Sequence, residues 1–248
     1  MAKVDVVCRY CHKTDEVKGH GEGRTGHPRY HCYACRKTFQ LNYTYQACHP
    51  GMKERIIDMS MNNAGVRDTA RVLKVGINTV IRTFKKLTPR QVTTLPLSGS
   101  EIHIVCEIDE QWSFVGNKRN QRWLWYAWEP NRKRVVAHVF GDRSRKTLKK
   151  LLALLSPFTI RFYCTDDYAV YDYLPKKKHL TGKKFTQRIE RTNLTLRIRI
   201  KRLNRKTIGY SKSEEMHDKV IGTFIEREYY IFITDLTIGN MTQAMDHW

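Results

Sequence analysis

Two closely spaced pairs of cysteines constrain how the first part of the chain can fold. The pairs are Cys8-x-x-Cys11 and Cys32-x-x-Cys35, separated by 20 residues rich in glycine, histidine and charge. A Cys-x-x-Cys turn places two thiolates on one side of a metal ion, and two such turns complete a tetrahedral site. A segment this short buries little apolar surface, so metal binding would supply most of its folding energy. The spacing predicts a structural zinc ribbon over residues 1–48, with redox dithiols or a rubredoxin-like iron site as the alternatives.

Three short helices are predicted next, over residues 52–61, 66–73 and 79–87. Apolar residues recur on one face of each segment, and Lys74-Val75-Gly76 forms a turn between the last two. Asn78 is expected to cap the third helix. A helix, a glycine-containing turn and a second, basic helix form the helix-turn-helix pattern, which we assign to residues 49–88. The alternative is a three-helix packing unit with no role in DNA binding.

The charge of the chain favours DNA as a partner of this region. There are 45 Lys+Arg against 24 Asp+Glu, a formal net charge of +21. A chain this basic is expected to bind a polyanion, because each neutralised phosphate releases counterions. A merely soluble basic protein, or one attracted to an anionic membrane, is the alternative. If the third helix enters the major groove of double-stranded DNA, its candidate contacts are Asn78, Thr79, Arg82 and Lys85.

The cysteine count and the hydropathy predict a cytoplasmic protein. An odd total of seven cysteines, with no secretion signal, argues against a disulfide framework. No apolar run approaches the roughly 18 residues of a membrane-spanning helix. The first nine residues lack the apolar core of a signal peptide. We therefore expect no membrane partner and an association with the nucleoid.

The rest of the chain predicts an α/β domain over residues 101–226. It follows a linker, residues 89–100, that contains two prolines and a Gly/Ser cluster. Strands are predicted over 102–108, 121–128, 134–140 and 159–165, with helices over 143–155 and 186–204. Three meandering strands, a helix and a fourth strand match the order of the ribonuclease-H-like (RNase H-like) fold. The right-handed crossover rule then places the first and fourth strands side by side. The chain is thus expected to be a multi-domain α+β protein.

Three acidic residues occupy positions in these elements that suit a metal-dependent active site. Asp109 follows the first strand, Asp166 follows the fourth, and Glu190 lies early in the basic helix. Such carboxylates can hold two Mg²⁺ or Mn²⁺ ions that align an in-line attack on a phosphodiester. Each acid alone could be a cap, a turn residue or an arginine partner.

Other acids compete for these roles. Glu110 points to the opposite side of an extended chain from Asp109. Asp142 resembles a helix cap. Both Asp166 and Asp167 end the fourth strand, and residue type alone does not decide between them. Asp167 and Asp172 could instead support the following segment.

The basic helix over 186–204 has two distinct stripes. The first carries Glu190, Asn193, Arg197 and Lys201. The second, expected to face the sheet, carries Ile189, Leu196, Ile200 and Leu203. The Glu190 carboxylate would therefore point at the metal ions while cations on its stripe lie along the DNA backbone. Further candidates for contacts with the DNA strands are Trp112, Trp123 and Trp125, with packing in the protein core as the alternative.

An ordered series of motifs resembles one known family. The motifs are Ile108-Asp109-Glu110-Gln111-Trp112, Gln121-Arg122-Trp123-Leu124, Val136-Ala137-His138-Val139-Phe140-Gly141, Thr186-Gln187-Arg188-Ile189-Glu190-Arg191-x-Asn193-x-x-x-Arg197, Arg205-Lys206 and Ser211-Lys212-Ser213. They are similar to the transposases of the insertion sequence one (IS-one) family, within the superfamily that uses an Asp-Asp-Glu (DDE) triad. The similarity extends from about Val6 to Phe224. That family also begins with a zinc finger and a helix-turn-helix, and its DNA-binding and catalytic parts (InsA and InsB) occur here in one chain.

The resemblance implies a role for each site residue. Asp109, Asp166 and Glu190 would be the catalytic, magnesium-binding triad. Arg197 lies where related enzymes have a basic DNA-contacting residue, and Asn193 would assist it. The family's second motif usually continues with Gly and Trp, where this chain has Asp167 and Tyr168.

The expected function is DNA transposition. The N-terminal modules would bind the terminal inverted repeats of an insertion sequence, and the triad would catalyse strand cleavage and strand transfer, in a synaptic homo-oligomer. Alternatives are a DNA-binding regulator or inactive copy, and a structure-specific nuclease. Residues 227–248 form a tail to which the sequence assigns no role.

Overall fold

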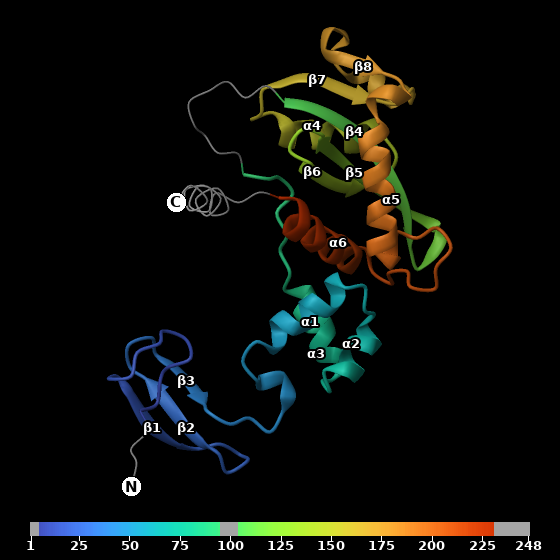
Figure 1. The fold of residues 1–248 in the computed structure, drawn as a ribbon. Coiled ribbons are helices and arrows are strands. Elements are labelled where there is room, and N and C mark those ends of the chain that lie inside the picture. The colour runs from blue at the N-terminus through green and yellow to red at the C-terminus, as the bar shows by residue number, and fades with distance from the viewer. Residues whose placement is uncertain (1–4, 95–103, 231–248) are drawn as a thin grey trace, which may run out of the picture.

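The computed structural model describes residues 5–94 and 104–230, so most of the predicted linker and tail lies outside the described residues. The described residues form two sheets and six α-helices (Figure 1). A small N-terminal sheet comes first along the chain, then helices α1 to α3, and then a larger sheet with helices α4 to α6. The strands are β1 Val17–Glu22, β2 Pro28–Cys32, β3 Lys37–Gln40, β4 Ile104–Val115, β5 Asn117–Glu129, β6 Arg134–Gly141, β7 Ile160–Thr165 and β8 His179–Thr181. The α-helices are α1 Met52–Met61, α2 Val66–Val72, α3 Ile77–Lys85, α4 Arg145–Leu155, α5 Gln187–Arg199 and α6 Glu214–Tyr229. Short 3-10 helices are η1 Gln46–Cys48, η2 Ala169–Tyr173, η3 Lys176–Lys178, η4 Lys183–Phe185 and η5 Lys201–Leu203.

The N-terminal sheet is an antiparallel meander of β1, β2 and β3. Its small core consists of Cys8, Cys32 and Phe39, with the other two paired cysteines packed against it. So few buried side chains cannot offset the entropy of ordering the segment, and a further stabilising interaction is needed.

The larger sheet has the strand order β6-β5-β4-β7-β8. Strands β4, β5 and β6 are antiparallel neighbours, whereas β7 lies parallel to β4, as the crossover argument predicts. Helix α4 covers one face, and α5 and α6 cover the other (Figure 1). Alternate residues of β5 serve the two faces: Trp125 joins the α4 core, while Leu124 and Tyr126 join the α5–α6 core.

The helical module of α1, α2 and α3 shares its core with α6. Ile56 and Phe84 lie in the same buried cluster as Val220 and Phe224. Polar contacts border this packing, with Arg227 Nη1 bound to Asp58 Oδ1 at 2.7 Å. Helix α6 therefore lies between the helical module and the larger sheet and packs against both (Figure 1).

Several element boundaries differ from those predicted. Helix α3 begins at Ile77 with Gly76 as its N-cap, so the prediction that Asn78 caps this helix is wrong. The extended backbone of Gly76 (ψ 143°) starts the helix two residues earlier than predicted. Helix α5 ends at Arg199, because Ile200 is extended, and only a 3-10 turn follows. Strand β4 continues to Val115, so Asp109 lies inside this strand and not after its end. Strand β8 is an additional strand that the sequence analysis did not predict.

In the described part of the chain, no helix has the length and apolar content needed to cross a lipid bilayer.

Candidate active site

The four paired cysteines converge at one point of the N-terminal module. Their sulfur atoms all lie within 4.8 Å of one another, with Cys8 Sγ 3.6 Å from Cys35 Sγ and Cys11 Sγ 3.5 Å from Cys32 Sγ. Tetrahedral zinc with Zn–S bonds of about 2.3 Å requires sulfurs about 3.8 Å apart. The donor set and its spacing therefore fit a four-coordinate zinc ion.

Helix α3 presents part of its predicted DNA-binding surface to solvent. Asn78, Arg82 and Lys85 are exposed, whereas Thr79 is half-buried and its hydroxyl lies 3.0 Å from Tyr45 Oη. The Lys85 carbonyl accepts a hydrogen bond from Lys219 Nζ, which ties the end of α3 to α6.

A row of polar side chains on β4 faces α5. Glu107, Asp109 and Gln111 alternate along the strand and therefore share one face. The Ile189 backbone N–H donates to Glu107 Oε2 at 2.7 Å, and Asn193 Nδ2 donates to Asp109 Oδ2 at 2.6 Å. Gln111 Nε2 completes the row by donating to the Asn193 carbonyl at 3.2 Å. These bonds fix α5 at one register along β4.

Asp109 and Asp166 lie at adjacent positions of neighbouring strands. The parallel register of β4 and β7 pairs Glu107 with Cys164, and each aspartate lies two residues further along its strand. Burial raises the pKa of Asp109 to about 7, and the charges of Glu110 and Asp166 act in the same direction. This carboxyl would be stabilised as an anion by a cation bound beside it.

Glu190 occupies the first turn of α5, one turn before Asn193. Its side chain is exposed, and Thr186 Oγ1 lies 3.5 Å from its Oε1. Within residues 5–94 and 104–230, the cysteines are the one group of three or more His, Cys, Asp or Glu residues with ligand atoms all within 4.8 Å. Asp109, Asp166 and Glu190 therefore do not form a cluster that tight.

The rival acids occupy different environments. Glu110 is buried on the α4 side of the sheet, opposite Asp109, as the alternation predicts. Asp142 is not a helix cap: Ser144 occupies the N-cap, and Asp142 Oδ1 accepts from the hydroxyls of Ser144 and Thr147. Asp167 is exposed, as Asp166 is.

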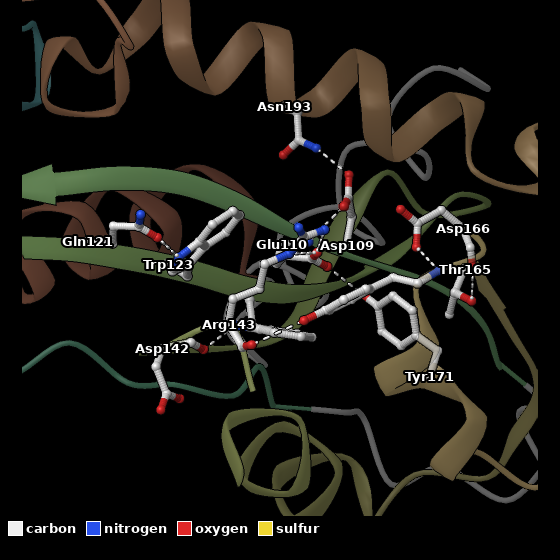
Figure 2. A network of polar contacts seen from close by, with 12 residues as sticks. Asp109, Glu110, Gln121, Trp123, Asp142, Arg143, Thr165, Asp166, Tyr171 and Asn193 are labelled. Atoms are coloured by element: carbon white, nitrogen blue, oxygen red, sulfur yellow. Dashed lines mark hydrogen bonds and ion pairs between the residues drawn. The ribbon is translucent and has the colours of Figure 1, made fainter. Parts of the chain in front are cut away.

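Arg143 lies at the centre of a polar and aromatic group beside the two aspartates (Figure 2). Its Nη2 lies 2.6 Å from Glu110 Oε1, and Tyr171 Oη donates to the other oxygen of that carboxylate at 2.6 Å. The guanidinium carbon lies 4.1 Å from the ring centroid of Tyr168 and 4.9 Å from that of Trp123. Cation–π contact and ion pairing together hold the guanidinium in one orientation.

Tyr168 connects this group to the second acid. Its backbone N–H donates to Asp166 Oδ1 at 3.1 Å, and its hydroxyl donates to the Arg143 carbonyl at 3.1 Å. Sequence reasoning missed Arg143 and Tyr168 as site residues. The one available signal was the Tyr that replaces the family's usual Trp two residues after Asp166.

The remaining predicted residues divide between exposed and interior positions. Arg197 is half-buried and its Nε has no hydrogen-bond partner among the described residues, while burial and nearby Arg205 lower its pKa. Lys201 is exposed but lies in the 3-10 helix η5, beyond the end of α5, so the prediction that it continues the α5 stripe is wrong. Asn193, expected on the DNA-facing stripe, is only 6% exposed and is bound to Asp109 instead. Trp125 is fully buried, which supports core packing for this tryptophan, whereas Trp112 and Trp123 are half-buried.

Comparison with protein-family models gives two matches that together cover most of the chain. Residues 103–231 match the model described as IS1 transposase, of the DDE type, and residues 43–87 match the InsA C-terminal domain, a helix-turn-helix model. Both models describe parts of insertion-sequence transposases, the first a transposase domain of the DDE type and the second a helix-turn-helix. The chain belongs to the IS1 transposase family.

Individual relatives agree with the family match. The chain is 59% identical over 128 residues to the insertion element iso-IS1n protein InsB of Shigella dysenteriae, covering 51% of this chain and 98% of that protein. It is 49% identical over 148 residues to an IS1 protein InsB of Escherichia coli strain K12, covering 59% of this chain and 89% of that protein. A solved viral intasome, from simian T-cell lymphotropic virus in complex with PP2A regulatory subunit B56 gamma, has a TM-score of 0.32 and 12% identity over 58% of this chain and 59% of that chain, a likeness that carries no argument.

Proposed function

We propose that this transposase binds the terminal inverted repeats of an insertion sequence and then cleaves and joins DNA strands in its RNase H-like domain. The catalytic residues in this proposal are Asp109, Asp166, Glu190 and Arg197. The observation that supports it is that Asp109 on β4 and Asp166, which directly follows the parallel neighbour β7, lie close enough for the Asp166 charge to raise the pKa of Asp109.

The triad carboxylates would hold two Mg²⁺ or Mn²⁺ ions. Bound there, the ions would supply Lewis acidity that activates the attacking water or 3′-hydroxyl and stabilises the leaving oxygen. Carboxylate oxygens are the ligands these hard cations prefer. The pKa of Asp109 is raised mainly by burial and further by the charges of Glu110 and Asp166, so a bound cation would stabilise its anionic form.

The protein's own groups would orient the reacting atoms. Asn193 holds one oxygen of Asp109, and the backbone N–H of Glu110 binds the other at 2.7 Å, which limits rotation of the carboxylate. The half-buried Arg197 guanidinium, on the same helix stripe, forms no ion pair with a carboxylate among the described residues and would donate to a DNA phosphate. Such an orientation reduces the entropy lost when the attacking oxygen is aligned with the phosphorus.

Recognition would belong to the N-terminal modules. The four-cysteine cluster would hold a structural zinc ion, and α3 would offer Asn78, Thr79, Arg82 and Lys85 to the major groove. Lys201, at the far end of α5, would contact the DNA backbone. We assign residues 1–48, 49–88 and 101–226 to the ribbon, the helix-turn-helix and the catalytic domain. Synapsis of two element ends would require a homo-oligomer, acting on the nucleoid of a bacterial cytoplasm.

A strand-cleavage and joining assay tests this proposal. Purified protein, Mg²⁺ and labelled duplex carrying the element ends should yield a nicked end and then a joined product. Asp109→Asn should bind the ends as the wild type does and yield neither product. End binding without products from the wild-type protein, in Mg²⁺ or Mn²⁺, would favour a regulator or an inactive copy. Cleavage that neither needs the end sequence nor leads to joining would favour a nuclease.

The same assay decides whether Asp166 or Asp167 is the second acid of the triad. Asp166→Asn is expected to abolish cleavage, whereas Asp167→Asn is expected to retain most of it, because Asp167 lies outside the row of groups linked to Arg143. The opposite result would move the metal site to Asp167.

A further inference from the structure

A pocket lies where the helical module meets the segment that follows α5. It has a volume of about 750 Å³ and is lined by the turn between α1 and α2 on one side and by residues 200–209 on the other. The two sides are joined by a hydrogen bond of 2.6 Å from the Lys201 backbone N–H to Asn63 Oδ1. Asn63 adopts a left-handed conformation (φ 72°), which directs the turn toward this contact. The pocket is therefore a fixed feature of the junction.

The pocket has a strong excess of positive charge. Four cationic residues line it: Arg67 from α2, and Lys201, Arg202 and Lys206 from the segment after α5. The one acidic residue in the lining is Asp68, and its carboxylate pairs with Arg71 at 2.9 Å. The lining cations are thus left without a neutralising group of their own.

Among these cations, Arg202 is the one for which the lack of a neutralising carboxylate costs most. Its side chain is half-buried, burial lowers its pKa, and its Nη1 donates to Ser211 Oγ at 2.8 Å. Among the described residues no carboxylate forms an ion pair with it. A guanidinium removed from water without a counter-ion is costly, and a bound anion would relieve that cost.

Ser60 supplies a second, independent observation. This serine lines the pocket and is only 9% exposed. Its hydroxyl has no hydrogen-bond partner among the described residues. Buried hydroxyls are nearly always bonded, so an unpartnered one beside four cations indicates a missing polar partner.

We propose that this pocket binds one phosphodiester of the DNA backbone, between the helix-turn-helix and the catalytic domain. The inference rests on the proposed binding of element ends. A phosphodiester fits because it presents a single negative charge and several acceptor oxygens to Arg, Lys and hydroxyl donors. The pocket uses residues of both modules, so one DNA contact would set the angle between recognition and catalysis.

The position of the pocket predicts which phosphate it binds. Glu190 lies in the first turn of α5 and the pocket follows the end of this helix. The eleven residue steps from Glu190 to Lys201 span about 16 Å at a helical rise of about 1.5 Å per residue. At about 3.4 Å per base pair this corresponds to roughly five base pairs along a duplex that lies parallel to α5. The contacted phosphate should therefore lie about five base pairs from the scissile one.

Binding measurements on the full chain test the inference. Fluorescence anisotropy with an element-end duplex would be recorded over a series of salt concentrations for Arg67→Gln, Lys206→Gln and the control Lys150→Gln, an exposed lysine of α4 outside the pocket. Each pocket variant should lower the salt slope by about one and weaken binding about fivefold near physiological salt. The control should match the wild type, and equal melting temperatures would establish that the variants fold.

A scan with single methylphosphonates, which neutralise one phosphate each, locates the contact. One substitution, about five base pairs from the cleavage point, should weaken the wild-type complex and have no further effect on Arg67→Gln/Lys206→Gln. If the wild type fails to bind element ends at all, the proposed function fails. If the wild type binds but the pocket variants behave as Lys150→Gln does, the pocket inference alone is overturned.

Inorganic phosphate is the probe for a small ligand. If ³¹P line broadening at millimolar phosphate depends on Arg202 and Lys206 while the DNA salt slopes stay unchanged, the pocket holds a free phosphate group and the DNA assignment is overturned. If DNA displaces the bound phosphate and the slopes change as predicted, the DNA assignment is supported.

Discussion

The Asn193 side chain joins Asp109 to the interior of the sheet. Its amide nitrogen donates to Asp109 Oδ2 at 2.6 Å, and its amide oxygen accepts from the Tyr126 hydroxyl at 2.9 Å. Tyr126 is fully buried, so this chain of bonds is held by the core. The orientation of the Asp109 carboxylate is therefore restricted by the packing of α5 on β4.

Asn193→Ala is expected to reduce strand cleavage about 10- to 100-fold, the usual effect of removing a group that orients a metal ligand. The concentration of Mg²⁺ needed for half-maximal cleavage should rise, while binding of element ends stays unchanged. Leu194→Ala is the matched control, because this neighbour on α5 is 57% exposed and should retain cleavage. Unchanged Mg²⁺ dependence in Asn193→Ala would show that Asn193 does not position the metal site.

Arg143→Ala is expected to lower the free energy of unfolding by about 1–3 kcal/mol, because it leaves the buried Glu110 carboxylate without its ion pair. Arg143→Lys should recover only part of this, since lysine cannot reproduce the bidentate pair or the stacking between Trp123 and Tyr168. Urea denaturation measures the effect. In the Glu110→Gln background the same change should cost less, and equal costs in both backgrounds would contradict the coupling.

Tyr168→Trp tests whether the family's usual residue can act in this site. A tryptophan retains the aromatic face over Arg143 and the backbone N–H bond to Asp166, but loses the hydroxyl bond to the Arg143 carbonyl. We expect Tyr168→Trp to cleave within a fewfold of the wild type, and Tyr168→Ala to lose at least about tenfold through a mobile Arg143. The cleavage rate at saturating Mg²⁺ is the measurement, and equal rates in the two variants would remove Tyr168 from the site.

Zinc removal should unfold the N-terminal module and leave the larger sheet folded. The ribbon buries few apolar side chains, so loss of a structural zinc removes most of its stabilisation. Cys32→Ser should copurify with less than a full equivalent of zinc and bind element ends weakly. Cys48→Ser is the control, because this exposed cysteine lies outside the cluster. Metal analysis and circular dichroism report the outcome, and full zinc content in Cys32→Ser would rule out the four-cysteine site.

Two buried histidines make the stability of the fold sensitive to acid. Burial lowers the pKa of His138 and of His217 to about 3 from the ordinary 6.5. The unfolded chain therefore binds more protons than the folded one between pH 6.5 and 3, and stability falls as the pH falls through this window. From pH 7.5 to 5.5 each histidine should account for about 1.4 kcal/mol of that loss.

The difference between wild type and His217→Gln isolates this effect, since carboxyls with raised pKa such as Asp109 act in the opposite direction in both proteins. The glutamine can still bond to Ser113 or Ser211, the two hydroxyl partners of His217. Urea denaturation at the two pH values should show a smaller loss in His217→Gln. An equal loss in both proteins would mean that His217 is not held neutral.

The spacing of apolar residues predicted the helices and strands that have one buried face and one exposed face. The pattern placed α1 at its observed bounds and assigned Ile189, Leu196 and Leu203 to the face that packs on the sheet. Burial of an apolar stripe decides such elements, and the stripe is visible in the residues themselves. The parallel placement of β4 and β7 followed from the handedness of crossovers, which holds for nearly all folds.

Features that depend on distant partners were not predictable. In the sequence, Asn193 is a polar residue on a basic stripe of the predicted helix. Its contact with Asp109, 84 residues earlier in the chain, depends on the packing of α5 on β4. The contacts of Arg143 likewise depend on three separate segments of the chain, which supply Glu110, Trp123 and Tyr168. The end of α5 at Arg199 has no proline or glycine to mark it, and the contact of the next residues with Asn63 accompanies it.

The shared core of α1, α3 and α6 has a consequence for the order in which the protein matures during translation. Ile56 and Phe84 are buried against Val220 and Phe224, which the ribosome delivers more than a hundred residues later. Until α6 emerges, the nascent recognition helices lack part of the surface that holds them in place. A chain interrupted before α6 would leave those apolar side chains open to chaperones and proteases. Synthesis of α6 is thus the event that completes the core of the helical module.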